Sequence, residues 1–487
     1  MALARCDGPA APQGPQGARS HRTTQLKIII LGAGQVGRTA AYHLAREEAN
    51  DVTVVDTNDD LLRDLQDRID IRTVQGNAAS PKTLEMAGAR NADMIVALTN
   101  GDEVNVVACH VAWTLFGTRT KIARIRSQSF TSSPELFVST EREVPARLAG
   151  FAVDLYLSPE EAVTAYIERL IRYPGALQVV DFADGRVRVV GLRAIKGGLL
   201  VGQPIRAIRQ HIPRVDARVA AIYRGGQSVD PEGDTVIEHG DEVYFIAATP
   251  DIRTVMSEMR KAEDPVKRLV IAGGGNIGLR LAQKLEEDNH QVKLIERDSK
   301  RAKRIAAQLR NSIVLNGDAA DEELLVEENI DSADVFCALT NSEEANILSA
   351  MLAKRLGAHR VMALISRPAY AELMQTGPID VAISPQSVTI GSLLAYVRSG
   401  DVVQVHSLRS GSAEAMETVA HGTRGGKVVG RAIDDIRLPG GASIIALVRG
   451  EDVIMAHHDT VVESGDHVIL FLADRRHVEQ VERLFQT

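Results

Sequence analysis

The stretch that decides the fold is Gly32-Ala33-Gly34-Gln35-Val36-Gly37, because the chain repeats it as Gly273-Gly274-Gly275-Asn276-Ile277-Gly278. Each copy follows a short β-branched run and opens an apolar pattern of helical period. A strand, a glycine-rich turn and a helix form the phosphate-binding opening of a Rossmann unit. Its glycines permit the tight turn, the approach of a pyrophosphate and close packing of helix on strand. Both hexapeptides are therefore candidate nucleotide-binding segments.

An acidic residue follows each glycine motif at the distance typical of a dinucleotide site. Asp56 ends the expected second strand of the first copy, and Glu296 ends that of the second, each about 20 residues beyond the motif. A carboxylate there accepts hydrogen bonds from a ribose diol and repels a 2′-phosphate, which favours NAD(H) or another unphosphorylated adenine nucleotide over NADP. Two alternatives remain: the acids merely end strands at a solvated edge, or Arg297 and Arg301 let the second copy tolerate an extra phosphate.

Length and composition limit the class of protein. At 487 residues the chain is too long for a single core, so two to four domains are expected. A net charge of -8 and 4% aromatic residues argue against nucleic acid as a partner. Cys6, Cys109 and Cys337 share no metal-like spacing. With no apolar run long enough to span a bilayer and no signal-peptide core, a cytoplasmic location is expected.

Strands and helices alternate regularly from Leu26. Short buried strands are expected at 26–31, 52–55, 71–75, 94–98 and 121–125, with apolar helical patterns between them. This alternation predicts an α/β fold with a doubly wound, parallel, Rossmann-like sheet. Residues 1–25, rich in Pro, Gly, Ala and Gln, are expected to be a disordered tail.

The second half of the chain repeats the first. One offset of 241 residues separates Gly32 from Gly273, Gly76 from Gly317 and Thr99 from Thr340. A helix near 159–171 and short strands punctuated by glycine turns at about 177–261 predict a small α+β lobe after the first sheet, and its features recur near the C-terminus. The expected domains are 26–145, 146–262, 266–385 and 386–487, that is, two nucleotide-binding domains, each followed by a connecting helix and a small lobe.

Polar residues follow the third, fourth and fifth expected strands of the repeat. Ligands of open parallel sheets bind at the carboxyl ends of strands, so these residues are further candidates for nucleotide contact. Their other interpretation is that they are ordinary turn and cap residues. Arg124 on the fifth strand can meet a phosphate, and the corresponding segment 362–365 holds no arginine, so the two sites are expected to differ. The candidates are Asn77, Thr99, Asn100 and Arg124 in the first copy and Asp318, Thr340 and Asn341 in the second.

The sequence offers little for catalysis. The histidines of the small lobes do not recur between copies in a way that suggests a mechanism, and neither a Cys/His metal cluster nor a Gly-x-Ser-x-Gly elbow occurs. We expect no enzyme, with a soluble NAD-dependent oxidoreductase as the alternative and a nucleotide-free scaffold as a third interpretation.

The apolar helix 105–115, repeated at 346–356, is explained by core packing or, through Trp113 and Phe116, by pairing of the two domains.

The chain resembles the TrkA family, the cytoplasmic regulatory subunits of bacterial Trk potassium uptake systems, whose tandem domains are of the RCK or KTN type. The resemblance extends from Leu26 to about Gln486 and is specific at 28–37, at Tyr173-Pro174-Gly175-Ala176-Leu177-Gln178-Val179-Val180 and at 345–355. It implies nucleotide-binding N-lobes for NAD(H), with ATP or ADP as further ligands, and C-lobes that dimerise or bind other ligands. It also implies a membrane-embedded potassium-translocating Trk subunit as partner at the inner membrane and a homo-oligomeric ring, a dimer or a tetramer. Gating by nucleotide is the implied function.

Overall fold

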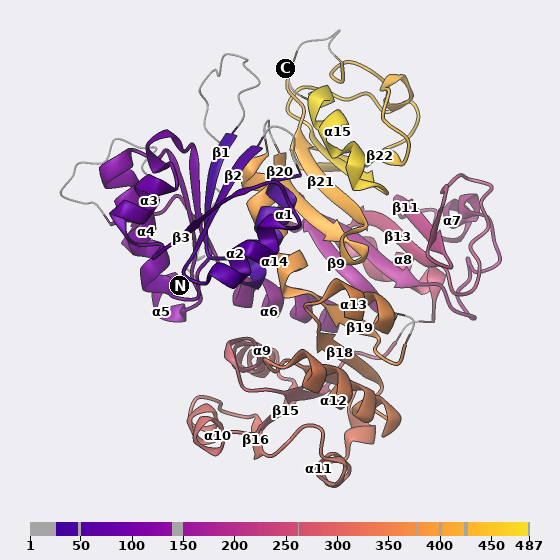
Figure 1. Ribbon diagram of the computed structural model, residues 1–487. Coiled ribbons are helices and arrows are strands. Elements are labelled where there is room, and N and C mark those ends of the chain that lie inside the picture. Colours follow the sequence, from indigo (N-terminus) through magenta and orange to yellow (C-terminus); the bar gives the residue numbers. More distant parts are fainter. Residues whose placement is uncertain are drawn as a thin grey trace, which may run out of the picture.

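The computed structural model describes residues 26–46, 50–138, 150–261, 263–375, 377–398, 402–422 and 427–485. The expected disordered tail at 1–25, with Cys6, and the expected boundary between residues 145 and 146 lie outside these residues. In Figure 1 the first N-lobe is drawn in indigo, the second N-lobe in brown below it, and the two C-lobes in magenta and yellow.

The first N-lobe is a six-stranded parallel sheet in the order β3-β2-β1-β4-β5-β8. Helices cover both faces, so residues 28–31 of β1 and all of β4 are buried, as their continuous apolar sequences predict. The expected doubly wound fold is confirmed. The elements are β1 (Leu26–Leu31), α1 (Gln35–Leu44), β2 (Asn50–Asp56), α2 (Asp59–Gln66), β3 (Arg72–Gln75), α3 (Pro81–Met86), β4 (Met94–Ala97), α4 (Asp102–Phe116), β5 (Thr120–Arg124), α5 (Gln128–Thr131), β6 (Phe137–Val138), β7 (Phe151–Ala152) and β8 (Leu155–Leu157).

The second N-lobe repeats this plan in the order β16-β15-β14-β17-β18-β19. Side-chain caps fix several helix starts: Asp298, Asp321 and Ser342 each accept a hydrogen bond from a backbone N–H of the first turn. The elements are β14 (Arg268–Ala272), α9 (Asn276–Glu287), β15 (Gln291–Glu296), α10 (Ser299–Ala306), β16 (Ile313–Asn316), α11 (Glu322–Glu327), β17 (Val335–Ala338), α12 (Glu343–Arg355), β18 (Arg360–Leu364), α13 (Pro368–Gln375) and β19 (Val381–Ile383).

Each C-lobe is a five-stranded antiparallel sheet, and the two sheets share one strand order, β12-β11-β13-β10-β9 and β23-β22-β24-β21-β20. Their apolar faces pack on each other around Phe182, Tyr244 and Phe471. The elements are α6 (Pro159–Arg172), β9 (Ala176–Phe182), β10 (Val187–Arg193), α7 (Ile208–His211), β11 (Ala217–Arg224), β12 (Gln227–Val229), β13 (Glu242–Ala248) and α8 (Ile252–Met259), then α14 (Pro385–Val397), β20 (Val402–Leu408), β21 (Ala413–Val419), β22 (Ala442–Arg449), β23 (Asp452–Met455), β24 (His467–Leu472) and α15 (Val478–Phe485).

The two halves are joined crosswise. Helix α6 leaves the first N-lobe and packs on α9 of the second, α14 returns to pack on α1 of the first, and α6 and α14 contact each other (Figure 1). One core cluster consequently combines the first N-lobe with α14 and the second C-lobe, and another combines the second N-lobe with α6 and the first C-lobe. Each N-lobe is stabilised by burial against the opposite half of the chain.

Pairing of the halves through Trp113 and Phe116 is wrong for contacts within the chain. The buried face of α4 packs on its own sheet, as the core-packing alternative predicts, and Phe116 lies against that same core. Trp113 is 38% exposed. The crossover helices and the C-lobe sheets pair the halves instead, because their apolar side chains are buried in core clusters that both halves share.

Candidate nucleotide-binding clefts

The first glycine loop is shaped by two close backbone approaches. Gly32 has φ +107°, and a Cβ there would lie 3.0 Å from the backbone of Leu98 and Thr99. A Cβ on Gly37 would lie 1.8 Å from the carbonyl oxygen of Gly32, so this glycine lets α1 close on β1. Gly34 differs: nothing lies within 4 Å of its Cβ position, which faces open space at the start of α1. An anion can approach the free N–H groups of the helix through this opening.

The second loop repeats this geometry. Gly273 has φ +106°, a Cβ on Gly278 would lie 2.0 Å from the Gly273 carbonyl oxygen, and the Cβ position of Gly275 is open. Neither α1 nor α9 has a side-chain cap, so their first-turn N–H groups have no side-chain acceptor. One difference separates the copies: a Cβ on Gly274 would lie 2.2 Å from Cδ1 of Ile305, whereas the first copy carries Ala33 at this place. In the second copy the side chain of Ile305 therefore fills the space that a Cβ at this position would take.

Asp56 ties the first loop to the end of β2. Its Oδ2 accepts a hydrogen bond from the backbone N–H of Ala33 at 2.6 Å, and its Oδ1 accepts one from Asn58 at 2.8 Å. A carboxylate offers about four lone-pair sites, so both oxygens can still accept a further bond from a ribose hydroxyl. The carboxylate holds the loop and stands where the ribose interpretation requires it.

Glu296 does the same in the second copy. Its Oε2 accepts from the N–H of Gly274 at 3.0 Å, and its Oε1 accepts from Asp298 at 2.9 Å. Nη1 of Arg301 lies 3.7 Å from Oε2 of Glu296 and offsets its negative charge, a feature of the second copy. Both acids therefore do more than end a strand, because each accepts a hydrogen bond from the backbone of its glycine loop.

Thr99 follows β4 and is held by a buried asparagine that the sequence reasoning missed. Asn105 Oδ1 accepts from the Thr99 N–H at 3.0 Å and from its hydroxyl at 2.7 Å, while Nδ2 donates to the carbonyl oxygens of Thr99 and Arg124. Asn346 holds Thr340 and the carbonyl of Leu364 in the same way. A polar residue on the buried face of an apolar helix, recurring at the offset of 241, is the signal that identifies this clamp.

The other polar candidates form turns at the same edge of the sheet. Asn77 Oδ1 accepts from the N–H of Ala79, and Asp318 Oδ1 accepts from Ala320, both at 2.9 Å, as Asx turns do. Asn100 and Asn341 lie in the turns that follow β4 and β17. Their turn role is present in the structure, and ligand contact by these four residues remains a prediction.

Arg124 reaches across to the crossover helix α6, a contact that sequence reasoning did not foresee. Its Nη2 lies 3.3 Å from Oε1 of Glu160, which also accepts from Nε of Arg126 at 3.0 Å. Within the described chain, Nε of Arg124 and Oε2 of Glu160 are buried without a hydrogen-bond partner. Burial lowers the pKa of Arg124 and Glu160 opposes this shift. A half-buried guanidinium with one buried, unused donor suits a phosphate oxygen.

Groups suited to covalent or metal chemistry are few in the described ranges. Cys109 and Cys337 are fully buried, and burial raises the pKa of both thiols to about 12, so they are unreactive thiols. The described part of the chain contains no group of three His, Cys, Asp or Glu side chains placed to hold a metal ion. None of the helices in that part is both long and apolar enough to cross a membrane.

Solved structures with this tandem architecture exist. The chain matches the crystal structure of the GsuK RCK domain with a TM-score of 0.59 and 20% identity, covering 96% of this chain and 98% of that one. It matches the GsuK channel bound to NAD with a TM-score of 0.57 and 20% identity, covering 95% of this chain and 79% of that one. At this identity the likeness establishes the RCK fold alone.

Sequence comparison identifies the family. The TrkA-N domain matches residues 28–136 and 269–385, and the TrkA-C domain matches residues 189–260 and 423–486. The Trk system potassium uptake protein TrkA of Halomonas elongata is 56% identical over 462 residues, which cover 95% of this chain and 99% of the relative. Proteins of the same name from Vibrio alginolyticus and Haemophilus influenzae are 55% and 49% identical over the same length. The chain therefore belongs to the TrkA family of Trk-system potassium uptake proteins.

Proposed function

We propose that the chain is the regulatory subunit of a Trk potassium uptake system, which binds NAD(H), or ADP and ATP, in its glycine-loop clefts and gates a membrane-embedded potassium-translocating subunit. It works on the cytoplasmic face of the inner membrane and carries out no covalent chemistry. The names of its relatives support the potassium role, and an NAD-bound channel of the same fold supports the ligand.

The observation that carries the proposal is the combination found at the first cleft. The Cβ position of Gly34 is open, α1 is uncapped, Asp56 keeps acceptor capacity, and Arg124 has a buried donor without a partner. Each feature suits one part of an adenine nucleotide: the phosphates lie over α1 and near Arg124, and the ribose lies against Asp56. The second cleft offers Gly275 and Glu296 without the arginine.

Helix α6 gives bound nucleotide a route to the rest of the molecule. Glu160 contacts Arg124 beside the first cleft, and the next residue, Glu161, lies 3.4 Å from Arg280 on α9, the helix that starts at the second glycine loop. A phosphate that draws Arg124 away from Glu160 shifts the charge balance at the start of α6. Nucleotide then favours the arrangement of the two halves to which it binds more tightly.

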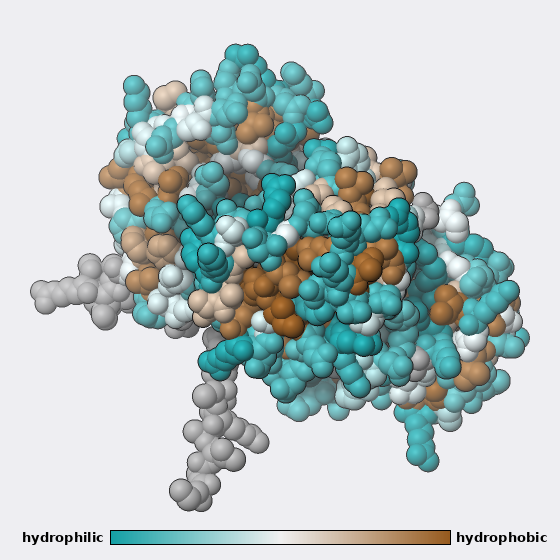
Figure 2. All heavy atoms as spheres, turned by 90° about the horizontal axis from the view of Figure 1, so that it is seen from below, coloured by the Kyte–Doolittle hydropathy of each residue, from teal (hydrophilic) through white to brown (hydrophobic). Residues whose placement is uncertain are grey.

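Exposed apolar side chains on equivalent helices support a homo-oligomer. Val107, Trp113 and Leu115 are exposed on α4, and Leu348 and Met351 are exposed on α12. Figure 2, seen from the side of the second N-lobe, shows apolar side chains gathered within a hydrophilic surface. Because the two helices are related by the internal repeat, one kind of contact can be used twice per chain, which suits a dimer or tetramer ring.

The test is calorimetric titration of NAD, NADH, ADP and ATP into wild type, Asp56→Ala and Glu296→Ala. Loss of a hydrogen bond between a ribose hydroxyl and a charged group corresponds to a loss of affinity of roughly tenfold to a hundredfold. Asp51→Ala, which removes an exposed carboxylate at the other end of β2, is the matched control. If neither cleft variant weakens any nucleotide, the site assignment is wrong.

Potassium uptake by cells that lack the gene tests the other half of the proposal. We expect uptake to fall without the chain and to return with the wild-type chain but not with a variant that has lost nucleotide binding. Unchanged uptake in the deletion refutes the regulatory role. Nicotinamide-dependent turnover by the purified chain would favour the oxidoreductase alternative, and absence of any nucleotide binding would favour a scaffold.

A further inference from the structure

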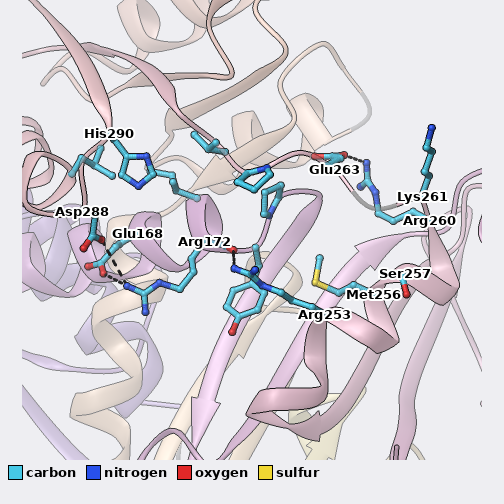
Figure 3. A pocket seen from close by; sticks show the side chains of 16 residues that line it. Glu168, Arg172, Arg253, Met256, Ser257, Arg260, Lys261, Glu263, Asp288 and His290 are labelled. Carbon is cyan, nitrogen blue, oxygen red and sulfur yellow. Dashed lines mark hydrogen bonds and ion pairs between the residues drawn. The ribbon is translucent and has the colours of Figure 1, made fainter. Parts of the chain in front are cut away.

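A cavity of about 280 Å³ lies where the first C-lobe meets the second N-lobe, at the opposite end of α9 from the second glycine loop. Its walls come from the end of α6, from α8, from residues 260–261 and 263–266, and from the end of α9 with the residues that follow it (Figure 3). Small-molecule sites are typically clefts of this kind, with an apolar wall and a few polar groups that fix the ligand.

The wall is mainly apolar. Ile171, Met256, Val266 and Leu285 are buried side chains that line it. They come from both sides of the junction, so a ligand here would contact the first C-lobe and the second N-lobe at the same time. The body of such a ligand must be aliphatic or aromatic to gain from burial.

Arg260 places a guanidinium on this wall. Nη1 donates to the carbonyl oxygen of Gly175 at 2.8 Å and Nη2 pairs with Glu263, while Nε is buried without a partner in the described chain. Gly175 has φ +85°, and a Cβ on it would lie 2.6 Å from the guanidinium carbon, so the glycine makes room for the arginine. The guanidinium of Arg260 is thus fixed by its contacts with Gly175 and Glu263, and one of its N–H donors is unused.

The charge around the cavity is positive once its internal pairs are counted. Arg172 is paired with Glu168 at 2.8 Å and lies 3.9 Å from Asp288 across the junction. Arg253 donates to the carbonyl oxygen of Arg172 at 3.3 Å, and Figure 3 shows it between Arg172 and Met256. Among the described residues neither Arg253 nor Lys261 has a carboxylate partner, and the four cations of the lining exceed its three carboxylates by one positive charge.

We propose that this cavity binds a small amphipathic anion, with an aliphatic or aromatic body against the apolar wall and one carboxylate or phosphate head near Arg253 and Arg260. Guanidinium groups bind both heads through paired N–H donors. Because its walls belong to both halves, the ligand holds the second N-lobe against the first C-lobe. This site is independent of the proposed nucleotide clefts.

The experiment is calorimetric titration of the full chain with octanoate and octyl phosphate. Octanol and octylammonium have the same body without a negative head, and acetate and phosphate have the head without the body. We expect one site per chain for at least one of the two amphipathic anions, with affinity that falls as salt rises and at least tenfold weaker binding of all four comparison compounds. The two anion arms decide which head the site takes.

A double variant, Arg253→Gln with Lys261→Gln, locates the binding. Both side chains lie at the surface of the cavity, so the fold should survive, and thermal melting checks this. We expect at least tenfold weaker binding of the anion and wild-type binding of nucleotide. The control is Lys82→Gln with Lys300→Gln, which removes two exposed charges elsewhere. Absence of binding by both anions, equal binding of octanol, or unchanged affinity in the double variant would overturn the proposal.

Discussion

A single methyl group at Gly34 should separate nucleotide binding from folding. Nothing lies within 4 Å of a Cβ at Gly34, and its φ of -67° is one that alanine adopts freely. Gly34→Ala should therefore leave the free energy of unfolding within about 0.5 kcal/mol of wild type, or raise it by about that amount through the less flexible unfolded chain. The added methyl group stands where a phosphate must approach the first turn of α1.

The expected loss of affinity follows from the bonds that the methyl group prevents. A hydrogen bond from a backbone N–H to a charged phosphate contributes about 1.5–3 kcal/mol, so the loss of one such bond weakens binding about tenfold or more. Calorimetry with ADP and NAD(H) on the variant measures this loss, and Gly275→Ala tests the second cleft in the same way because its Cβ position is also open.

Gly37→Ala is the opposite control. Its Cβ would lie 1.8 Å from the carbonyl oxygen of Gly32, so α1 must move by about 1 Å, at a cost of roughly 1–3 kcal/mol. For a unit of this size that corresponds to a fall in melting temperature of about 2–4 °C per kcal/mol. Wild-type nucleotide affinity in Gly34→Ala would refute the placement of the phosphates, and wild-type stability in Gly37→Ala would refute the packing argument.

Three further outcomes are expected. Glu160→Gln should lower the melting temperature of the nucleotide-free chain, because it leaves Arg124 without its carboxylate partner. The variant should bind ADP about tenfold more tightly, because the phosphate no longer competes with the negative charge of Glu160 for Arg124, and weaker binding in calorimetry would contradict this. The hydrogen bond that His467 donates to the carboxylate of Glu417 raises the pKa of His467, so its stabilising contribution is full below pH 6.5 and is lost as pH rises through the raised value. Urea unfolding of wild type and His467→Gln from pH 5.5 to 8.5 should therefore show a difference in stability that shrinks with rising pH. Leu348→Glu should lower the mass of the oligomer in light scattering without changing the melting temperature of the monomer, because this side chain is 62% exposed.

The features that the sequence predicts well are those formed by residues close to one another along the chain. The glycine loop, the acid at the end of β2 and the polar turn after β4 follow from strand and turn chemistry within about 100 residues, and the repeat gave each of them twice. The crosswise core could not be predicted, because the apolar residues of α6 and α14 indicate that each helix is buried but not which N-lobe it packs against. Glu160 was missed for the same reason: its partner Arg124 lies on another element, and only the path of α6 brings the two together. Asn105 was the one missed residue with a visible signal, since it recurs as Asn346 on a buried helix face.

The two clefts differ in how they are connected to the crossover helices. In the first, the start of α14 brings Gln386 to 3.4 Å from Gln35 of the glycine loop, while α6 places Glu160 on Arg124. In the second, Leu364 occupies the position that corresponds to Arg124, so no charge pair of this kind can form.

A nucleotide phosphate that binds Arg124 in the first cleft therefore competes with the buried carboxylate of Glu160, whereas the second cleft has no such charge pair. Occupancy of the first cleft should move α6, and through Glu161 and Arg280 it should move the helix of the second glycine loop. A nucleotide bound at Asp56 should therefore change the affinity of the second cleft at Glu296. By thermodynamic linkage, a nucleotide in the second cleft must change the affinity of the first cleft by the same factor. Gly34→Ala weakens one cleft and Gly275→Ala weakens the other, so comparing the affinity of the remaining cleft with wild type measures the coupling from both directions.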